Sequence, residues 1–327
     1  MGDRCSIFHN LVRDIGVSTS ASGIPGVCNN AIAGICHQTF GTGEETNVGK
    51  TEEPILPVST STPPNFPPEQ RRLFVEVLEL MNARNVPYVV SGAFALQKHT
   101  GIWRDTKDLD LFLAPEDVPK ALSELAAHGF ETEVCDPVWL AKAHRADFFV
   151  DLITGMSNAV ISVDRSWIER AAPADILGVP SRVLGAEELI ASKLFVTRRE
   201  RFDGADIVHV IHGTQGRLDW DRVLKTVNEH WEIVLWAMVL FQYTYPAQSH
   251  FIPRRIWDDL LGRLRDQLDN PNPRAHFRGS LLDENMFAID VHEWGMANLI
   301  ERSRALREGK IPSDLGEQVQ RNAADVA

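Results

Sequence analysis

Cysteine is scarce in this sequence, and the few cysteines present are not spaced for a shared role. The 327 residues include four cysteines: Cys5, Cys28 and Cys36 near the start, and Cys135 alone. No C-x-x-C pair occurs, and no histidines follow at zinc-finger spacing. The pattern argues against a disulfide framework and against a cysteine zinc site, and it favours a reducing, cytoplasmic environment.

Long apolar runs and an excess of basic residues are also missing. The longest apolar run extends from Ile233 to Phe241, far short of the ~20 residues that a membrane-spanning helix needs. The formal net charge is -12, from 33 basic and 45 acidic residues, which argues against a general electrostatic grip on nucleic acid. We therefore expect no membrane association, although an acidic body can still carry one local basic cleft.

The first 68 residues hold little apolar surface that a fold could bury. Serine, threonine, glycine and asparagine dominate this stretch, and six prolines lie between Pro54 and Pro68. Such a segment cannot offset its ordering entropy through burial. We predict a disordered leader over residues 1–68, with room for a short helix near Phe8–Ile15.

Beyond the leader, helical and strand patterns alternate. An apolar stripe from Leu73 to Met81 predicts a helix that ends at Asn85 and Pro87. Further helices begin at Gly92 and Pro115, and strands are expected at 88–91, 108–113, 130–135 and 147–153. After about residue 185 we predict helices near 187–200, 204–212, 220–230, 232–241 and 255–268. These patterns predict an α/β (α+β) core with a small mixed sheet over residues 69–215, then a helical region with a charged tail over 216–327.

Two aspartates lie two positions apart on the strand predicted at 108–113. Because alternate residues of a strand face the same side, Asp108 and Asp110 project together while Leu109 and Leu111 enter the core. Paired carboxylates repel, and a bound cation relieves that repulsion. Oxygen ligands of this kind suit Mg²⁺ or Mn²⁺. The pair therefore predicts a metal site, against the alternative of a turn cap or a solvated strand end.

A third aspartate occupies the strand predicted at 147–153, where Asp147, Phe149 and Asp151 share one face. A bare charge on so apolar a strand is unfavourable without a partner. If this strand lies beside the strand at 108–113, Asp151 completes a two-metal clamp. Such a clamp holds the attacking and leaving oxygens of an in-line displacement at phosphorus.

The turn Ser91-Gly92 joins a strand to a helix. Glycine permits close backbone approach to a phosphate, and the first turn of a helix offers unpaired N–H groups. The Ser91 hydroxyl is expected either to cap the helix or to bind a phosphate oxygen. Lys193 breaks an apolar helix pattern and, with Arg104 and Arg201, is a candidate for stabilising triphosphate charge. The alternative for Arg201 and its neighbouring arginines is a solvated helix face.

Two weaker patterns lie nearby. Asp206, His209 and His212 follow at three-residue steps, which suits either a helical metal site or ordinary polar positions at a helix end. Trp103 precedes the aspartate strand, where it would stack on a base or, as we favour, pack into the fold.

The combination of Ser91-Gly92, Asp108-x-Asp110 and Asp151 resembles the nucleotidyltransferases of the polymerase-β superfamily. The stretch from Arg104 to Leu111, and the later series Lys193-Leu, Arg201 and Asp203-x-x-Asp206, resemble the AbiEii and MenT branch of toxin nucleotidyltransferases. The resemblance covers residues 85 to 215. It implies that the core over residues 69–215 has the nucleotidyltransferase fold.

The resemblance also implies a chemistry. Such enzymes use Mg²⁺ or Mn²⁺ to move a nucleotide from a nucleoside triphosphate such as ATP to a hydroxyl, and they release pyrophosphate. Asp108, Asp110 and Asp151 would bind the metal and, with Lys193, form the catalytic set. The residues expected to bind the nucleotide are Ser91, Gly92, Arg104, Lys107, Arg201 and Asp203.

The acceptor stays open between two classes. The toxin branch, which would make this a toxin-antitoxin-like protein, uses tRNA, whereas other branches modify aminoglycoside or lincosamide antibiotics. The acidic body favours a small cationic acceptor over tRNA. A nucleotide-binding or regulatory protein without turnover is the alternative from another class. No cognate protein partner can be deduced from the sequence.

Overall fold

A computed structural model describes residues 62–104, 106–199 and 201–310, and all of them belong to one unit. Most of the predicted leader, with its helix near Phe8–Ile15, lies outside the described residues. Near its end, the ring of Phe66 packs edge-on against Phe74 at 5.6 Å between centroids and stacks on Phe94 at 5.9 Å. Packed structure therefore begins before the predicted boundary at residue 68, because these aromatic contacts hold Phe66 against the fold.

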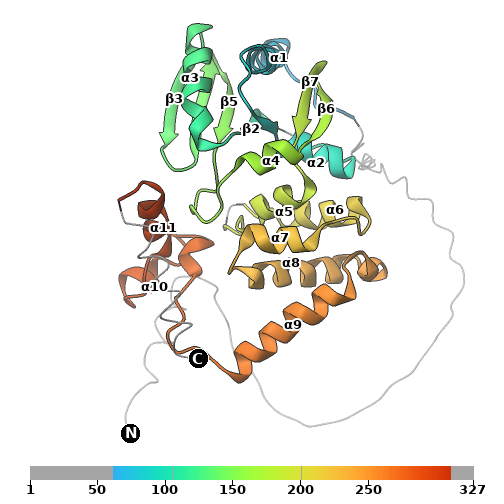
Figure 1. Cartoon of the computed structure of the whole chain (residues 1–327), viewed down its shortest axis with the longest axis vertical. Helices are drawn as coiled ribbons and strands as arrows, with labels where there is room; N and C mark the ends of the chain where they lie inside the picture. Colours follow the sequence, from blue (N-terminus) through green and yellow to red (C-terminus); the bar gives the residue numbers. More distant parts are fainter. Residues whose placement is uncertain (1–61, 105, 200, 311–327) are drawn as a thin grey trace, which may run out of the picture. The chain divides into compact units, whose positions relative to one another are not determined.

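The described structure contains a seven-stranded mixed sheet, whose strands lie in the upper part of Figure 1. Its strands are β1 (Val89–Val90), β2 (Asp108–Phe112), β3 (Glu131–Asp136), β4 (Leu140–Arg145), β5 (Phe148–Ile153), β6 (Ala172–Ile176) and β7 (Val179–Val183). Their order is β3-β4-β5-β2-β1-β7-β6. β2 pairs parallel with β5 and antiparallel with β1, which in turn pairs parallel with β7. The predicted α/β fold with a mixed sheet is confirmed.

Alternation along β2 and β5 divides each strand between the core and a polar face. Leu109 and Leu111 are fully buried, as are Val150 and Leu152 on β5. Helices α1 (Pro68–Ala83) and α3 (Val118–Ala127) pack against the sheet. The aspartates at the intervening positions remain partly exposed, as the period of two predicts.

Three strands were not predicted from the sequence. β4 contains two alanines and no β-branched residue, so its intrinsic preference for a strand is weak. β6 and β7 each contain a proline, which normally argues against a strand. Pro173 lies on the edge strand β6, and Pro180 lies beyond the single point where β7 pairs with β1. Neither proline therefore removes a needed hydrogen bond of the sheet.

The helices after the last strand form a packed group: α5 (Ala186–Leu194), α6 (Gly204–Thr214), α7 (Trp220–Val227), α8 (Trp231–Thr244) and α9 (Arg254–Asp269). A shorter helix, α4 (Arg165–Arg170), lies between β5 and β6. α2 (Gly92–Thr100) contacts both α5 and α6, and α8 contacts α6, α7 and α9. Figure 1 shows α5 to α9 together on the side of the sheet from which α2 projects. No helix in the described ranges is long and apolar enough to cross a membrane.

The helix predicted at 187–200 is wrong in its second half. α5 ends at Leu194, and a loop with an isolated bridge between Thr197 and Phe202 follows. One local and one long-range hydrogen bond hold this loop: the Asp203 N–H donates to the Val196 carbonyl, and the Arg199 N–H donates to the distant Asp283 carboxylate. The neighbouring arginines therefore lie on a loop rather than on a solvated helix face.

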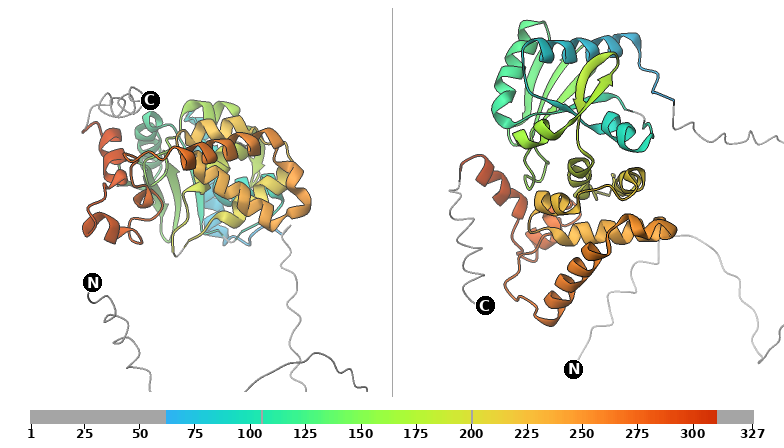
Figure 2. Two further views of the ribbon diagram at one scale, coloured as in Figure 1. Left: turned by 90° about the horizontal axis from the view of Figure 1, so that it is seen from below. Right: turned by 45° about the vertical axis from the view of Figure 1, so that its right-hand side comes forward.

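We call residues 277–307 the C-terminal arm. It contains the short helix α10 (Ala288–His292) and α11 (Leu299–Arg307), drawn in red in Figure 2. The arm returns to the sheet after α9: Arg304 forms a bidentate ion pair with Asp136 on β3, at 2.9 and 2.8 Å. The Asn158 amide also donates to the Leu281 carbonyl at 3.0 Å. These polar contacts hold the arm, whereas its apolar side chains Ile289, Trp294 and Met296 remain exposed.

Candidate active site

Parallel pairing of β2 and β5 sets Asp110 directly beside Asp151. Asp108, Asp110 and Asp151 each offer a carboxylate oxygen, and these oxygens all lie within 4.8 Å of one another. The Thr106 hydroxyl donates to the Asp108 carboxylate at 2.8 Å and orients it. In the described part of the chain, this is the one group of three or more potential ligands close enough to hold a metal ion. The prediction that the two strands are neighbours is confirmed.

The glycine turn packs directly on this carboxylate cluster. The Ser91 N–H donates to the Asp110 carbonyl at 2.9 Å, and Gly92 follows with a φ of +56°. A Cβ atom on Gly92 would lie 1.9 Å from Asp110 Oδ2. Glycine is therefore required both by the left-handed backbone and by the close approach of the carboxylate. The Ser91 side chain makes no capping hydrogen bond to α2, which removes the capping alternative.

The carboxylates of the cluster are unfavourable as bare charges. Burial, followed by the charges of Asp108 and Asp151, raises the pKa of Asp110 to about 7. Burial also raises the pKa of Asp151, although Lys142 opposes the shift. Three carboxylates that lie this close together are a donor set that fits a hard divalent cation, which would supply positive charge between them.

Lys142 is a residue of this site that the sequence analysis missed. It lies opposite Asp151 in the β4–β5 ladder, and its ammonium group donates to Asp151 Oδ1 at 2.5 Å. The same ammonium lies 4.0 Å from the centroid of the Phe149 ring. The available signal was the alternation of Leu140-Ala-Lys-Ala-His-Arg145. That alternation becomes visible only once β4 is recognised as a strand.

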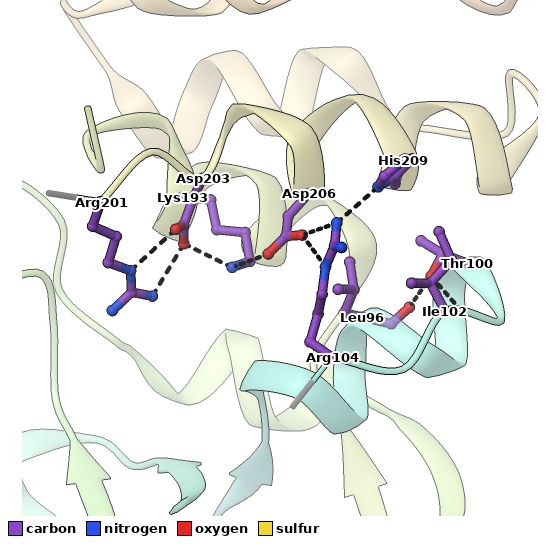
Figure 3. A network of polar contacts seen from close by, with 9 residues as sticks. All are labelled: Leu96, Thr100, Ile102, Arg104, Lys193, Arg201, Asp203, Asp206 and His209. Carbon is purple, nitrogen blue, oxygen red and sulfur yellow. Dashed lines mark hydrogen bonds and ion pairs between the residues drawn. The ribbon is translucent and has the colours of Figure 1, made fainter. Parts of the chain in front are cut away.

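A second polar group lies at the start of α6 (Figure 3). The Lys193 ammonium donates to Asp203 at 2.8 Å and to Asp206 at 2.9 Å, and its side chain is only 11% exposed. Burial alone would raise the pKa of Asp203, but hydrogen bonds from Arg201 and Lys193 bring it below its ordinary value. Lys193 is thus fixed between two carboxylates.

Two arginines extend this group at either end, as Figure 3 shows. The Arg201 guanidinium donates twice to Asp203, at 3.0 and 3.1 Å. Arg104 donates to Asp206 at 3.1 Å and lies 3.2 Å from His209 Nδ1. Burial and the charge of Arg104 lower the pKa of His209. Three cations face two carboxylates, so the group carries one surplus positive charge.

The metal trio considered for Asp206, His209 and His212 does not form. Asp206 is bound by Lys193 and Arg104, and the His212 ring packs 4.6 Å from that of Tyr245. Those contacts leave no common ligand position for the three side chains.

Two further candidates lie away from the cluster. Lys107 is exposed, and its backbone carbonyl accepts a hydrogen bond from Gln70. Trp103 packs edge-on against Phe94 at 5.4 Å, as the packing alternative predicts.

One cavity of about 530 Å³ brings both groups together. The three aspartates line it, as do Ser91, Gly92, Arg104, Lys193, Arg201 and Asp203. Lys107 is the one predicted site residue that does not line it. The far wall comes from the loop after β5 and from the C-terminal arm. The cavity therefore has room for a ligand between a carboxylate cluster and a cationic group.

Solved structures with partial likeness to this chain include several nucleotidyltransferases. The antibiotic-resistance factor ANT(2'')-Ia is 18% identical, with 56% of this chain and 96% of that chain covered and a TM-score of 0.34. The lincosamide antibiotic adenylyltransferase LnuA is 15% identical over 43% and 95%, with a TM-score of 0.31. An antigenic nucleotidyltransferase-like protein from Paracoccidioides brasiliensis is 16% identical over 56% and 93%, with a TM-score of 0.38. Similarity this low says nothing about the substrate of this chain.

The family comparison covers more than half of the chain. No curated protein matches the sequence. The profile of one family does match it, over residues 71–247, and this range contains every predicted site residue. The match runs from α1 through the sheet and the cationic group to α8. The chain belongs to the family described as nucleotidyltransferase of unknown function, DUF6036.

Proposed function

We propose that this nucleotidyltransferase moves a nucleotide from a Mg²⁺-bound nucleoside triphosphate to an acceptor hydroxyl. The observation that carries the proposal is the convergence of Asp108, Asp110 and Asp151 within 4.8 Å at one end of a cavity whose other polar group is cationic. Carboxylates that bind metal beside cations that bind phosphate are the recurring parts of phosphoryl-transfer sites. Mn²⁺ fits the same donor set.

The three aspartates would hold the divalent cations. A bound Mg²⁺ supplies positive charge that neutralises the triphosphate and the charge developing in the transition state. Asp110 serves best as the shared ligand, since it lies between Asp108 on its own strand and Asp151 on the next. Asp151 would in addition accept the proton of the attacking hydroxyl.

The triphosphate would lie between the start of α2 and the cationic group. Ser91, Gly92 and Ala93 line the cavity, where the Ser91 hydroxyl and the unpaired N–H groups at the start of α2 would donate to phosphate oxygens. Arg104 and Arg201 are more exposed than Lys193, with side-chain exposures of 43% and 66% against 11%. The arginines would therefore contact phosphate directly. Lys193 would act mainly by holding Asp203 and Asp206 in place.

The transfer itself conserves atoms and charge. The acceptor oxygen forms a bond to the α-phosphorus of the triphosphate while the bond between the α-phosphorus and the bridging oxygen breaks. Pyrophosphate leaves, and the hydroxyl proton passes to Asp151. The acceptor would enter from the side of the loop after β5, where the arm closes the cavity. The experiment tests both acceptor classes, tRNA and a small hydroxyl-bearing molecule.

The experiment uses the full-length protein with Mg²⁺, each α-labelled nucleoside triphosphate, and either bulk tRNA or a panel of aminoglycosides and lincosamides. Label on one class identifies the acceptor, and release of pyrophosphate accompanies it. Asp108→Asn and Asp110→Asn should each lower the transfer rate at least ~100-fold while the protein stays folded. Asp269→Asn, at an exposed position on α9, is the matched control.

Two outcomes would count against the proposal. Triphosphate binding without label transfer or pyrophosphate release would identify a nucleotide-binding protein without turnover. Full transfer by the Asp110→Asn protein would show that the cluster is not the catalytic centre. Assignment to the AbiEii and MenT toxin branch stays a prediction, which label on tRNA would support.

A further inference from the structure

Three arginines reach the short loop 155–157 that follows β5. Arg198 donates to the Ser157 hydroxyl at 2.8 Å, and Arg304 donates to the Ser157 carbonyl at 3.5 Å. Arg307 covers Gly155 so closely that a Cβ there would lie 2.5 Å from its Nη1 atom. Arg198 belongs to the loop after α5, whereas Arg304 and Arg307 lie on α11 (Figure 1). Segments far apart in the sequence therefore concentrate guanidinium groups at one point.

These arginines are not all neutralised. Arg304 is paired with Asp136 at 2.8 Å. Burial alone would raise the pKa of Asp283, but backbone N–H donors and, to a smaller extent, the charge of Arg198 lower it, so Arg198 has a carboxylate nearby. Arg307 has no hydrogen-bond or ion-pair partner among the described residues. Its side chain is half-buried, and burial lowers the pKa of its guanidinium. Three positive charges thus face two negative ones, and the unpaired charge is the partly desolvated one.

A half-buried arginine without a counter-charge is unusual, because desolvated charges in proteins are normally paired. A guanidinium has five donors in a planar fork that matches the oxygens of a phosphate. The loop it covers is also well placed. Gly155, Ser157 and Arg198 line the same cavity as Asp151, the member of the cluster on β5.

We propose that Arg307, with Arg198 and Arg304, binds a phosphate group carried by the acceptor and so directs the acceptor hydroxyl toward Asp151. That the bound phosphate belongs to an acceptor rests on the proposed function, whereas phosphate binding at these arginines does not. Two sources share this chemistry: the phosphodiester next to the 3′ end of a polynucleotide, and the phosphate of a small phosphorylated alcohol. The site supplies the local basic patch that an otherwise acidic protein needs to hold an anion.

Binding is tested without the reaction. The full-length protein is heated in EDTA with increasing inorganic phosphate, and the unfolding temperature is followed. Arg307→Met removes the charge but keeps an apolar chain of similar reach. Arg265→Met, at an exposed position on α9, is the control, because it loses one positive charge outside the cluster. Phosphate also stabilises proteins by exclusion from their surface, and this general effect is the same in all three proteins.

Phosphate should raise the unfolding temperature more in the wild type and in Arg265→Met than in Arg307→Met. Without phosphate, Arg307→Met should be as stable as the wild type or more stable, since it no longer buries an unpaired charge. Equal phosphate stabilisation of Arg307→Met and the control would overturn the proposal, because it would leave an adventitious ion effect only. A large loss of stability without phosphate would instead identify Arg307 as a residue that packs the arm.

Transfer assays then separate the two sources and the two proposals. A six-nucleotide single strand with a free 3′ hydroxyl and glycerol 3-phosphate are offered with Mg²⁺ and labelled triphosphate. For whichever accepts label, Arg307→Met should raise the acceptor KM about 10-fold and leave the triphosphate KM unchanged. Unchanged acceptor KM would refute the inference while the transferase proposal stands. Loss of phosphate binding in Arg307→Met without transfer to any acceptor would refute the transferase proposal alone.

Discussion

At the scale of single residues, Gly92 and Asp110 depend on each other. Gly92 has a left-handed backbone, and the Asp110 carboxylate occupies the space where a side chain would begin. The turn therefore forms the surface against which the Asp110 carboxylate rests, in addition to the phosphate contact that we propose for it. Asp110 in turn is held where its own ionisation is unfavourable.

Gly92→Ala should destabilise the protein by ~2 kcal/mol or more, because alanine is strained at this φ and its methyl group displaces Asp110. The free energy of unfolding, measured in urea, tests this expectation. Gly262→Ala is the control, since Gly262 lies on α9 with open space around its Cα. That substitution should be neutral or stabilising by up to ~1 kcal/mol. Equal effects at the two positions would contradict the close approach of Gly92 and Asp110.

Asp110→Asn should stabilise the metal-free protein at pH 8, although we expect it to slow transfer. In the folded protein the pKa of Asp110 is about 7, against an ordinary value of 3.8. The folded state therefore holds the proton more tightly, and its stability falls as pH rises from ~4 to ~7, by at most ~4 kcal/mol. Asparagine carries no charge and escapes this loss.

The measurement is thermal unfolding of both proteins in EDTA at pH 5 and pH 8. We expect the variant to unfold ~5 °C higher at pH 8, with a smaller difference at pH 5, where most of the wild-type carboxyl is protonated. Asp269→Asn again serves as the control. If the difference in unfolding temperature between the variant and the wild type is no larger at pH 8 than at pH 5, Asp110 ionises in the folded protein without a cost in stability.

At the scale of elements, helix α5 links the site to the helical region. It carries Lys193 in its last turn and the fully buried Glu188 in its first. Glu188 forms ion pairs with Arg222 on α7 and with Arg170 on α4. Its oxygens make no well-aligned hydrogen bond in the described structure, so charge rather than directed bonding holds these helices together.

Glu188→Ala should therefore lower stability by ~3–5 kcal/mol, because it leaves the partly buried Arg222 without its counter-charge. The expected fall in unfolding temperature is about 10 °C. Thermal unfolding by circular dichroism measures it, and Glu169→Ala, at an exposed position on α4, is the control. If Glu188→Ala and Glu169→Ala unfold at the same temperature, the ion pairs of Glu188 do not stabilise the packing of α5.

At the scale of the whole molecule, charge is unevenly distributed. The formal net charge is -12, yet the described cavity has a cationic group at the start of α6, and Arg198, Arg304 and Arg307 contact the loop after β5, which lines the same cavity. An acidic exterior repels polyanions in general, while local clusters can hold particular phosphates. The arm contributes two of these arginines, so a segment without an assigned chemical role in the sequence becomes part of the acceptor side.

The period of two along a strand was enough to predict much of the site. It predicts that Asp108 and Asp110 share one face and that Leu109 and Leu111 lie in the core, because side chains alternate along any strand regardless of its neighbours. The turn at Gly92 was visible for the same local reason. Residues that act through nearby backbone geometry can be identified from their own stretch of sequence.

Only the tertiary structure decided which distant groups meet. The parallel register of β2 and β5 sets Asp151 beside Asp110, and the unpredicted strand β4 brings Lys142 to Asp151. The loop after α5 places Lys193 between two carboxylates, where the sequence predicted a longer helix. Arg307 meets Gly155 across most of the C-terminal half of the chain. Such contacts depend on strand pairing and on the packing of the arm against the sheet. Both are interactions between distant segments, and the residues of one segment do not indicate which other segment it will contact.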